Sequence, residues 1–239
     1  MTSEASDEWV LLPGTLCTPE VFAPLLDHLG VAEEKQHFIE VNAPHLQDYD
    51  GPLRAAATGG QIVCGFSLGA MILAHNLNAL DRAKAVILLA CNPFPDPKGN
   101  RANREAVRDR ILAGEARDWV EENWALMSND PSETLRSFVA DMAKNTSQFI
   151  AAQTELAVSR PGASEQLMAT KLPLIFVAGD RDQLTPPDPL RPIVPACQNA
   201  TFDVLEGLGH FALLEAPDRV AMAISRRLEA VVSKSNSET

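Results

Sequence analysis

The sequence IVCGFSLG at residues 62–69 decides the fold, because it joins an apolar strand to a helix through a very tight turn. Ile62–Cys64 is a short apolar run of the kind that forms a strand buried on both faces, and a helical pattern begins at Leu68. A turn this sharp imposes unusual dihedral angles on Ser67, and side chains at Gly65 and Gly69 would collide with the neighbouring strand and helix. We therefore expect the Ser67 hydroxyl at the N-terminus of a helix, where negative charge is stabilised. The alternative is an ordinary Gly-Ser turn without a special role.

Five other apolar runs bounded by turn residues resemble the strand before Ser67. They lie at Trp9–Leu12, Phe38–Val41, Ala85–Ala90, Leu174–Ala178 and Thr201–Leu205. Helical patterns separate most of these runs, at Pro19–Leu29, Leu68–Leu80, Asp188–Ala196 and Pro217–Val232. Alternating buried strands and helices predict an α/β fold with a mostly parallel sheet of about six strands, flanked by helices.

One long segment interrupts this alternation. Between Asn92 and Lys171 the sequence shows only helical patterns, at Asn103–Ala113, Glu115–Met127, Ser132–Asn145 and Gln148–Val158. A single crossover usually carries one helix, so four helices favour a helical cap placed over one end of the sheet. We expect a core made of residues 8–92 and 171–232, with the cap inserted as residues 93–170. The alternative is that these helices continue the core on one face of the sheet.

The charge balance argues against two kinds of partner. The chain has 239 residues, with 20 Lys and Arg against 32 Asp and Glu, so its formal net charge is −12. A field of this sign repels nucleic acid and anionic membrane surfaces. The apolar run Ala85–Cys91 is also much shorter than the roughly 20 residues that cross a bilayer. We therefore expect neither a nucleic-acid partner nor a membrane partner; the sequence does not indicate an oligomeric state.

The cysteines and the N-terminal residues predict a reduced, cytoplasmic protein without a metal. Cysteines at positions 17, 64, 91 and 197 show no C-x-x-C spacing and are too few for a disulfide scaffold. No cluster of His, Cys, Asp or Glu has the spacing of metal ligands, so we expect neither metal nor other cofactor. The opening MTSEASDE is acidic and lacks the features of a signal peptide.

A serine hydroxyl needs a base before it becomes a nucleophile, and His210 is the best candidate. It follows the strand Thr201–Leu205 in the loop EGLGHF at 206–211, whose glycines allow a compact path over the carboxyl edge of the sheet. The other histidines, at positions 28, 37, 45 and 75, are expected to be structural. The imidazole in turn needs a carboxylate, and both Asp180 and Asp182 follow the strand Leu174–Ala178. One of them would hold His210, while the other would form part of the turn.

Two backbone donors are expected to stabilise an oxyanion beside Ser67. The N–H of Leu68 follows the serine directly, and the second donor should come from the loop at residues 13–17 after the first strand. We assign this second donor to Thr15, with Leu16 as the alternative. Alternatively, Thr15 has only a structural role, in which its side chain forms a local hydrogen bond.

Four motifs together resemble the α/β-hydrolase superfamily over residues 9–232. They are LLPGTLC at 11–17, GFSLG at 65–69, GDRD at 179–182 and GLGH at 207–210. The chain is most similar to small bacterial carboxylesterases, including pimeloyl-carrier-protein methyl ester esterases and enol-lactone hydrolases. The resemblance implies Ser67 as nucleophile, His210 as base and Asp182, rather than Asp180, as the acid, in the chain order typical of that superfamily. It also implies Thr15 and Leu68 as the oxyanion hole.

The chain departs from this family pattern in two places. Many relatives have His-Gly where this sequence has Pro13-Gly14, and the chain starts at what would be the third strand of the full fold. Six parallel strands are therefore expected. Ser67 itself argues against haloalkane dehalogenase and epoxide hydrolase chemistry, in which relatives carry an aspartate at this position.

The resemblance implies hydrolysis of a small-molecule carboxylic ester through an acyl-enzyme. The same triad serves thioesterases, lactonases and C–C bond hydrolases, and some members of the superfamily are small-molecule receptors or signalling proteins without turnover. Apolar side chains are candidates for the substrate pocket, although packing is their more ordinary role. These candidates are Phe66, Trp119, Trp124, Phe149 and Phe211, together with Met127 and Phe138.

Arginines on the first helix of the inserted segment suggest a docking site for an acyl-carrier protein. Arg101, Arg104 and Arg108 share a helix face by their spacing, and Arg110 is close by. An acidic carrier protein that delivers an acyl chain would fit such a patch. The alternative is a solvated helix face, because Glu105 and Asp109 are interleaved with the arginines.

Overall fold

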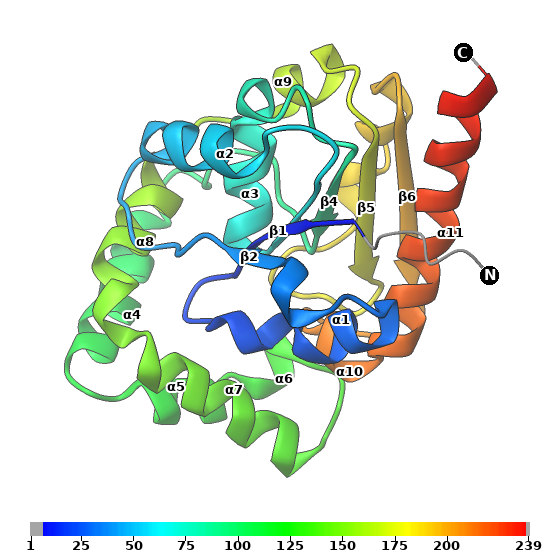
Figure 1. The fold of residues 1–239 in the computed structure, drawn as a ribbon. Helices are drawn as coiled ribbons and strands as arrows, with labels where there is room; N and C mark the ends of the chain where they lie inside the picture. The colour runs from blue at the N-terminus through cyan, green and yellow to red at the C-terminus, as the bar shows by residue number, and fades with distance from the viewer. Residues whose placement is uncertain (1–6, 238–239) are drawn as a thin grey trace.

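The computed structural model describes residues 7–237 and has a parallel sheet at its centre (Figure 1). Within these residues the sheet has six strands in the order β2-β1-β3-β4-β5-β6, and every pairing is parallel. The strands are β1 Trp9–Leu12, β2 Gln36–Phe38, β3 Ile62–Phe66, β4 Ala85–Leu89, β5 Leu174–Gly179 and β6 Ala200–Leu205. The expected α/β fold with six parallel strands is confirmed. Residues 1–6, on which the expectation of no signal peptide largely depends, lie outside the described part.

Helices cover both faces of the sheet because its strands are apolar on both faces (Figure 1). Along β1, Trp9 and Leu11 belong to one buried cluster, and Val10 and Leu12 belong to the other. The first cluster contains residues of α1 (Ala23–Leu29) and α11 (Pro217–Ser237). The second contains residues of α2 (Asp50–Ala56), α3 (Leu68–His75) and α9 (Ser164–Ala169). This alternation is the pattern expected of a parallel sheet covered on both sides.

The segment between β4 and β5 is helical, as expected. Its helices are α4 Arg101–Leu112, α5 Ala116–Glu122, α6 Trp124–Met127, α7 Glu133–Asn145, α8 Ile150–Ser159 and α9. In Figure 1, α5, α6 and α7 (green) lie below the sheet, at the end toward which the β5 arrow points. Val120 of α5 and Val139 of α7 share a buried cluster with Leu11 and Phe66 of the sheet. Apolar side chains of this segment therefore belong to the same buried core as residues of β1 and β3.

Several predicted elements differ from those observed. The strand expected at Phe38–Val41 lies instead at Gln36–Phe38, at the sheet edge, where it pairs only with β1. The helix expected at Asp188–Ala196 is two short 3-10 turns, Asp188–Leu190 and Val194–Ala196. Prolines at 189, 192 and 195 remove the N–H groups that a continuous helix requires.

Other helix boundaries also differ from the sequence-based expectation. The expected helix Glu115–Met127 is divided into α5 and α6 at Asn123, whose side chain donates a hydrogen bond to the Trp119 carbonyl. Helix α2, which begins with Asp50-Gly51-Pro52, and helix α9 were not predicted. Helix α11 extends beyond the expected Val232 to Ser237. Helix α10, which precedes α11, is the single turn Ala212–Glu215.

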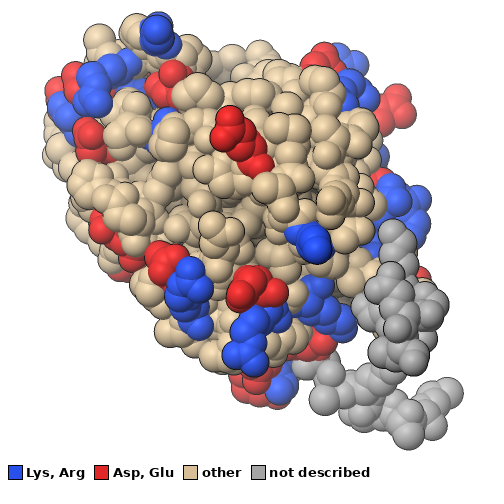
Figure 2. Space-filling view, turned by 90° about the horizontal axis from the view of Figure 1, so that it is seen from above, with Lys and Arg blue, Asp and Glu red and all other residues tan. Residues whose placement is uncertain are grey.

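Surface charge is dispersed on the face shown in Figure 2, where uncharged residues cover most of the centre, a single acidic group lies among them, and groups of both signs lie around the margin. That face carries no continuous basic patch of the kind that binds nucleic acid. Among residues 7–237, no helix combines the length and the apolar character that a membrane span requires.

Candidate active site

Ser67 lies in a strained turn between β3 and α3. Its φ of 52° and ψ of −114° place it in a backbone region that residues with a side chain seldom adopt. The two flanking glycines explain why the turn can form. A Cβ on Gly65 would lie 2.6 Å from the Ala70 nitrogen, and one on Gly69 would lie 2.1 Å from the Leu12 carbonyl oxygen. The chain therefore needs glycine at both positions to hold the serine at the end of the strand.

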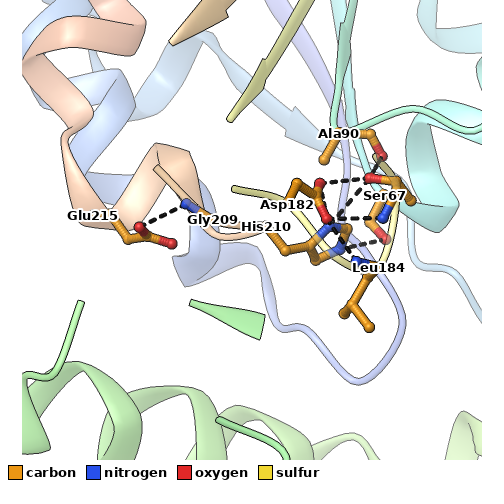
Figure 3. A network of polar contacts seen from close by, with 8 residues as sticks. Ser67, Ala90, Asp182, Leu184, Gly209, His210 and Glu215 are labelled. Atoms are coloured by element: carbon orange, nitrogen blue, oxygen red, sulfur yellow. Dashed lines mark hydrogen bonds and ion pairs between the residues drawn. The ribbon is translucent and has the colours of Figure 1, made fainter. Parts of the chain in front are cut away.

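Ser67, His210 and Asp182 come together at the carboxyl edge of the sheet (Figure 3). His210 Nε2 lies 3.0 Å from Ser67 Oγ, and His210 Nδ1 lies 2.8 Å from Asp182 Oδ2. The Asp182 and His210 side chains are 0% and 5% exposed, so this pair is shielded from water. Residues that are 143 positions apart in the chain thus form one continuous hydrogen-bonded series.

The turn after β5 anchors the Asp182 carboxylate. Its Oδ1 accepts hydrogen bonds from the backbone N–H groups of Leu184 (2.9 Å) and Thr185 (2.8 Å), and its Oδ2 accepts one from Thr185 Oγ1 (2.6 Å). Burial by itself would raise the pKa of Asp182. The neighbouring His210 and the Thr185 hydrogen bonds outweigh burial and lower the pKa below the usual aspartate value. Asp182 is therefore held as a carboxylate facing the imidazole.

This pKa shift predicts how stability depends on pH. A carboxyl group with a lower pKa in the folded state stabilises the protein above its unfolded pKa of about 3.9, and loses that contribution as the pH falls toward the folded value. The stability difference between the wild type and Asp182→Asn is thus expected to shrink between about pH 5 and pH 3. Urea unfolding at a series of pH values measures this difference. A difference that stays constant over that range would contradict the assignment.

Asp180, the alternative carboxylate, has a different place in the structure. Its Oδ1 accepts a hydrogen bond of 2.6 Å from the Gly207 N–H, so it joins the β5 turn to the loop after β6. The structure therefore brings Asp182, and not Asp180, to His210. His75 takes no part in the contacts around Ser67, because its ring nitrogens contact the backbone carbonyl oxygens of Met71 and Pro161.

Thr185 is a residue that the sequence analysis missed. Its hydroxyl lies 3.3 Å from His210 Nδ1 and 3.1 Å from the Ala90 carbonyl oxygen, in addition to its bond to Asp182. It thereby joins the ends of β4 and β5 to the imidazole. A local signal for it exists in the sequence, because a threonine three residues after an aspartate in a turn is well placed to bond that carboxylate.

The loop after β1 brings Thr15 into the wall of the cavity that Ser67 also borders. Within the described residues the Thr15 N–H donates no hydrogen bond, whereas the Leu16 N–H donates to Gln153 Oε1 at 3.1 Å. Leu16 has a φ of 57°, a second strained position in this site. Of the two donors considered from the sequence, Leu16 is thus already engaged, while Thr15 and Leu68 border the same cavity as Ser67.

Gln153 of α8 holds this loop in place and was not predicted. Besides accepting from Leu16, it donates through Nε2 to the Val41 carbonyl at 2.8 Å, and its side chain is buried. Gln153→Leu would leave two buried backbone groups unpaired, at about 1–3 kcal/mol each. We expect the free energy of unfolding to fall by about 2–6 kcal/mol, measured by urea denaturation.

Gln166→Leu on the exposed surface of α9 is the matched control for this variant. A surface substitution of this kind is expected to change stability by no more than about 0.5 kcal/mol. Equal stabilities for the two variants would show that Gln153 does not support the loop.

A cavity of about 380 Å³ opens beside Ser67 and His210. Its walls come from the β1 loop, from α4, α5, α7 and α8 and from the His210 loop, and its volume falls within the usual range for small-molecule sites. Among the expected pocket residues, Phe66, Trp119, Met127 and Phe211 border it.

Trp124, Phe138 and Phe149 lie outside the walls of this cavity, contrary to the expectation. Trp124 packs against Phe211 with ring centroids 6.4 Å apart and donates its indole N–H to the Asp130 carbonyl. Phe149 borders a separate, smaller cavity near the β1 loop. Helical spacing alone could not distinguish these packing roles from a place in the cavity.

The loop that carries His210 is fastened to the segment between β4 and β5. The His210 and Phe211 N–H groups both point to the Met127 carbonyl oxygen, at 2.9 and 3.3 Å. Glu215 lies on the other side of His210 from Ser67 (Figure 3), and its Oε2 accepts from the Gly209 N–H at 2.9 Å and from the Asn129 N–H at 3.3 Å. Neither Met127 nor Glu215 was predicted in this bracing role.

The cysteines are buried thiols in the described part of the chain. Cys17 borders the cavity, but burial raises its pKa to about 12, against a smaller lowering effect of a hydrogen bond to Gly14. It is therefore protonated at neutral pH and a poor nucleophile. No group of three or more potential metal ligands lies together within residues 7–237.

The arginines of α4 are paired with acidic side chains. Arg101 bonds Glu105 and Glu155, and Arg108 bonds Asp109. Arg110 in turn bonds Glu115 and Glu122. Arg104 borders the cavity and bonds Asp96. The four arginines thus do not form a patch of uncompensated charge.

The fold agrees with what sequence comparison finds. Residues 9–223 match the model of the alpha/beta hydrolase family, and the chain belongs to that family.

Curated relatives of similar length are pimeloyl-[acyl-carrier protein] methyl ester esterases of two bacteria. The protein of Xanthomonas campestris is 26% identical over 93% of this chain and 95% of its own length. That of Xanthomonas oryzae is 24% identical with the same coverage.

Solved structures with the same fold include several esterases. An esterase from Thermogutta terrifontis, described with malate bound, has a TM-score of 0.81 at 18% identity and covers 95% of this chain and 90% of its own. An esterase from Exiguobacterium antarcticum has a TM-score of 0.78 at 14% identity, covering 94% and 92%. At such identities the likeness concerns the fold alone.

Proposed function

We propose that this chain is a serine hydrolase that cleaves a carboxylic ester through an acyl-enzyme. The observation that carries the proposal is the hydrogen-bonded series from Asp182 through His210 to Ser67, at 2.8 and 3.0 Å, beside a mostly apolar cavity. The names of the curated relatives, which are methyl ester esterases, support an ester as the substrate. We further propose residues 93–170 as a cap that shapes the substrate cavity.

In the first half-reaction, Ser67 Oγ attacks the ester carbonyl carbon while His210 Nε2 accepts the hydroxyl proton. The carbonyl oxygen becomes an oxyanion, which the N–H groups of Leu68 and Thr15 stabilise. Asp182 holds the Nδ1–H tautomer of the imidazole and stabilises the imidazolium that forms. When the C–O bond breaks, the imidazolium gives its proton to the leaving alcohol, and the acyl group remains on Ser67.

In the second half-reaction, water takes the place of the alcohol. His210 removes a proton from this water as the water attacks the acyl carbonyl. The oxyanion forms again in the same place, the bond to Ser67 Oγ breaks, and Ser67 recovers its proton from the imidazolium. The acid product leaves, and the site returns to its starting state.

A panel of substrates tests this proposal. Purified protein is incubated with short p-nitrophenyl esters, methyl esters, thioesters and lactones, and release of product is followed. The proposal requires steady-state turnover of esters, with an initial burst of p-nitrophenol where deacylation is slow. Faster turnover of thioesters or lactones than of esters would reassign the substrate. If a fluorophosphonate labels Ser67 but no substrate shows steady-state turnover, the result would instead support a receptor on the hydrolase fold.

We also propose that an acyl-carrier protein delivers the acyl chain to this site. The names of the curated relatives support this proposal. The exposed Arg101 and the half-buried Arg108 allow a test, because neither borders the cavity. Replacement of both by glutamate should slow turnover of a carrier-linked ester and leave a small methyl ester unaffected. Unchanged turnover of the carrier-linked ester would exclude docking on this helix face.

A further inference from the structure

The cavity beside Ser67 has a charge opposite to that of the protein as a whole. The chain has a net charge of −12 with 32 acidic residues, yet the described residues that border this cavity include no aspartate or glutamate. They do include two arginines, Arg104 of α4 and Arg160 at the end of α8. The acidic surface of the protein repels anions, whereas the two arginines that line this cavity attract them. The cavity therefore favours an anionic ligand.

Arg160 is buried without a full set of partners. The residue is 3% exposed, and one guanidinium nitrogen, Nη1, donates to the Ala157 carbonyl and lies 3.8 Å from Asp96 Oδ1. Its Nε is buried and has no hydrogen-bond partner within the described residues. A buried guanidinium that lacks partners is unfavourable, since an uncompensated charge loses its hydration without an equivalent replacement.

One carboxylate serves both arginines. Asp96 accepts hydrogen bonds from Arg104 Nε (2.9 Å) and Nη2 (2.6 Å), whereas its closest approach to Arg160 is the longer contact of 3.8 Å. The Asp96 side chain is 4% exposed, so the three groups form a buried cluster with one negative and two positive charges. Burial and the nearby Arg104 both lower the pKa of Arg160, against the opposing effect of Asp96. The cluster therefore carries one positive charge that no acidic group within residues 7–237 neutralises.

We propose that the substrate of this site is an ester that carries a second, anionic group, a carboxylate or a phosphate, which Arg160 and Arg104 bind in the same cavity as Ser67. This inference rests on the proposed ester hydrolysis and narrows its substrate class. The guanidinium of Arg160 would gain the acceptor that Nε lacks, and the anion would neutralise the excess charge of the cluster. The apolar side chains that line the cavity between the two arginines and Ser67 would contact the chain that links the anion to the ester.

Matched esters test the proposal on the wild-type protein. Monomethyl esters of linear dicarboxylic acids with four to eight carbons are compared with methyl alkanoates of equal chain length, and methyl ω-phosphooxyalkanoates form the third arm. A hydrogen-bonded charged group contributes about 1.5–3 kcal/mol, so kcat/KM should be about 10- to 100-fold higher for the anionic ester at the optimal length. The arm with the higher value distinguishes carboxylate from phosphate. Equal kcat/KM in all arms would overturn the proposal while leaving ester hydrolysis intact.

Arg160→Met tests the residue, because methionine retains much of the side-chain volume without the charge. This variant should reduce kcat/KM for the anionic ester about 10- to 100-fold more than for the neutral ester, mainly through KM. Arg136→Met is the matched control, since the partly exposed guanidinium of Arg136 on α7 makes a 3.9 Å contact with Glu133 and does not border the cavity. Equal losses on both esters in Arg160→Met would contradict the assignment.

A binding measurement keeps the proposal testable without turnover. Isothermal titration of Ser67→Ala protein with adipate and with hexanamide should show adipate binding and weak or no hexanamide binding. The Ser67→Ala, Arg160→Met double variant should lose the adipate signal. If the phosphate arm has the higher kcat/KM, 6-phosphooxyhexanoate replaces adipate as the titrant. Binding of the preferred anion that is undetectable in the Ser67→Ala protein, or unchanged in the double variant, would refute the anion site. Absence of ester turnover in the wild type would instead refute the proposed function.

Discussion

Ser67→Ala is expected to reduce kcat for ester hydrolysis by about 10⁴- to 10⁶-fold. The variant retains the cavity and the proposed oxyanion donors but lacks the only oxygen that lies 3.0 Å from His210 Nε2 among the described residues. Without it no acyl-enzyme can form, and the remaining activity would come from binding and from electrostatic stabilisation alone. Steady-state hydrolysis of p-nitrophenyl acetate, with protein purified separately from any wild-type material, measures this effect.

Ser233→Ala on α11 is the matched control, because within the described part of the chain its hydroxyl bonds only the Glu229 carbonyl on the exposed helix surface. Its kcat should equal that of the wild type. Circular dichroism should show that both variants are folded. A Ser67→Ala protein that is folded and retains more than about a tenth of the wild-type kcat would contradict the role proposed for this serine.

Gly69→Ala should be strongly destabilising. The added Cβ would lie 2.1 Å from the Leu12 carbonyl oxygen and 2.7 Å from that of Pro13, and both are backbone atoms that cannot move without shifting β1. A substitution that creates overlaps of this size is expected to lower the free energy of unfolding by about 4–5 kcal/mol or more, which few substitutions do. In a chain of this length the melting temperature should fall by roughly 8–20 °C, as measured by calorimetry.

Gly51→Ala in α2 is the control for this glycine. No heavy atom lies within 4 Å of the added Cβ, and the residue lacks a positive φ, so stability should be unchanged or rise by up to about 1 kcal/mol. A Gly69→Ala protein with the stability of Gly51→Ala would show that the turn at Ser67 is less constrained than the structure indicates.

Much of the fold could be predicted because the information is local. The buried strands β1, β3, β4 and β5 are continuous apolar runs ended by turn residues, and this pattern depends only on neighbours in sequence. The edge strand β2 was misplaced because the apolar run that suggested it continues past the pairing. Ile39 still donates a hydrogen bond to the Leu11 carbonyl, but it lies beyond the observed strand.

The residues of the candidate site also fall into two groups: some are marked by their neighbours in the sequence, and others come together only in the folded chain. Ser67 and His210 stand in turns whose glycines mark them in the sequence. The choice between Asp180 and Asp182 depended on family resemblance, because both follow β5 and only the folded chain shows which one contacts the imidazole. Gln153 and Arg160 could not be predicted, since each acts on residues far away in the chain: Gln153 bonds Leu16, 137 positions distant. No sequence pattern marks such contacts.

The central claim is that His210 and Asp182 make the Ser67 hydroxyl reactive. Treatment with a fluorophosphonate, followed by proteolysis and mass spectrometry of the peptides, tests it most directly. We predict a single phosphonate adduct located on Ser67 in the folded wild-type protein, with much slower labelling in His210→Ala and in urea-unfolded protein. Contradiction would come from a folded wild-type protein in which Ser67 stays unmodified, or from labelling that proceeds equally fast without His210.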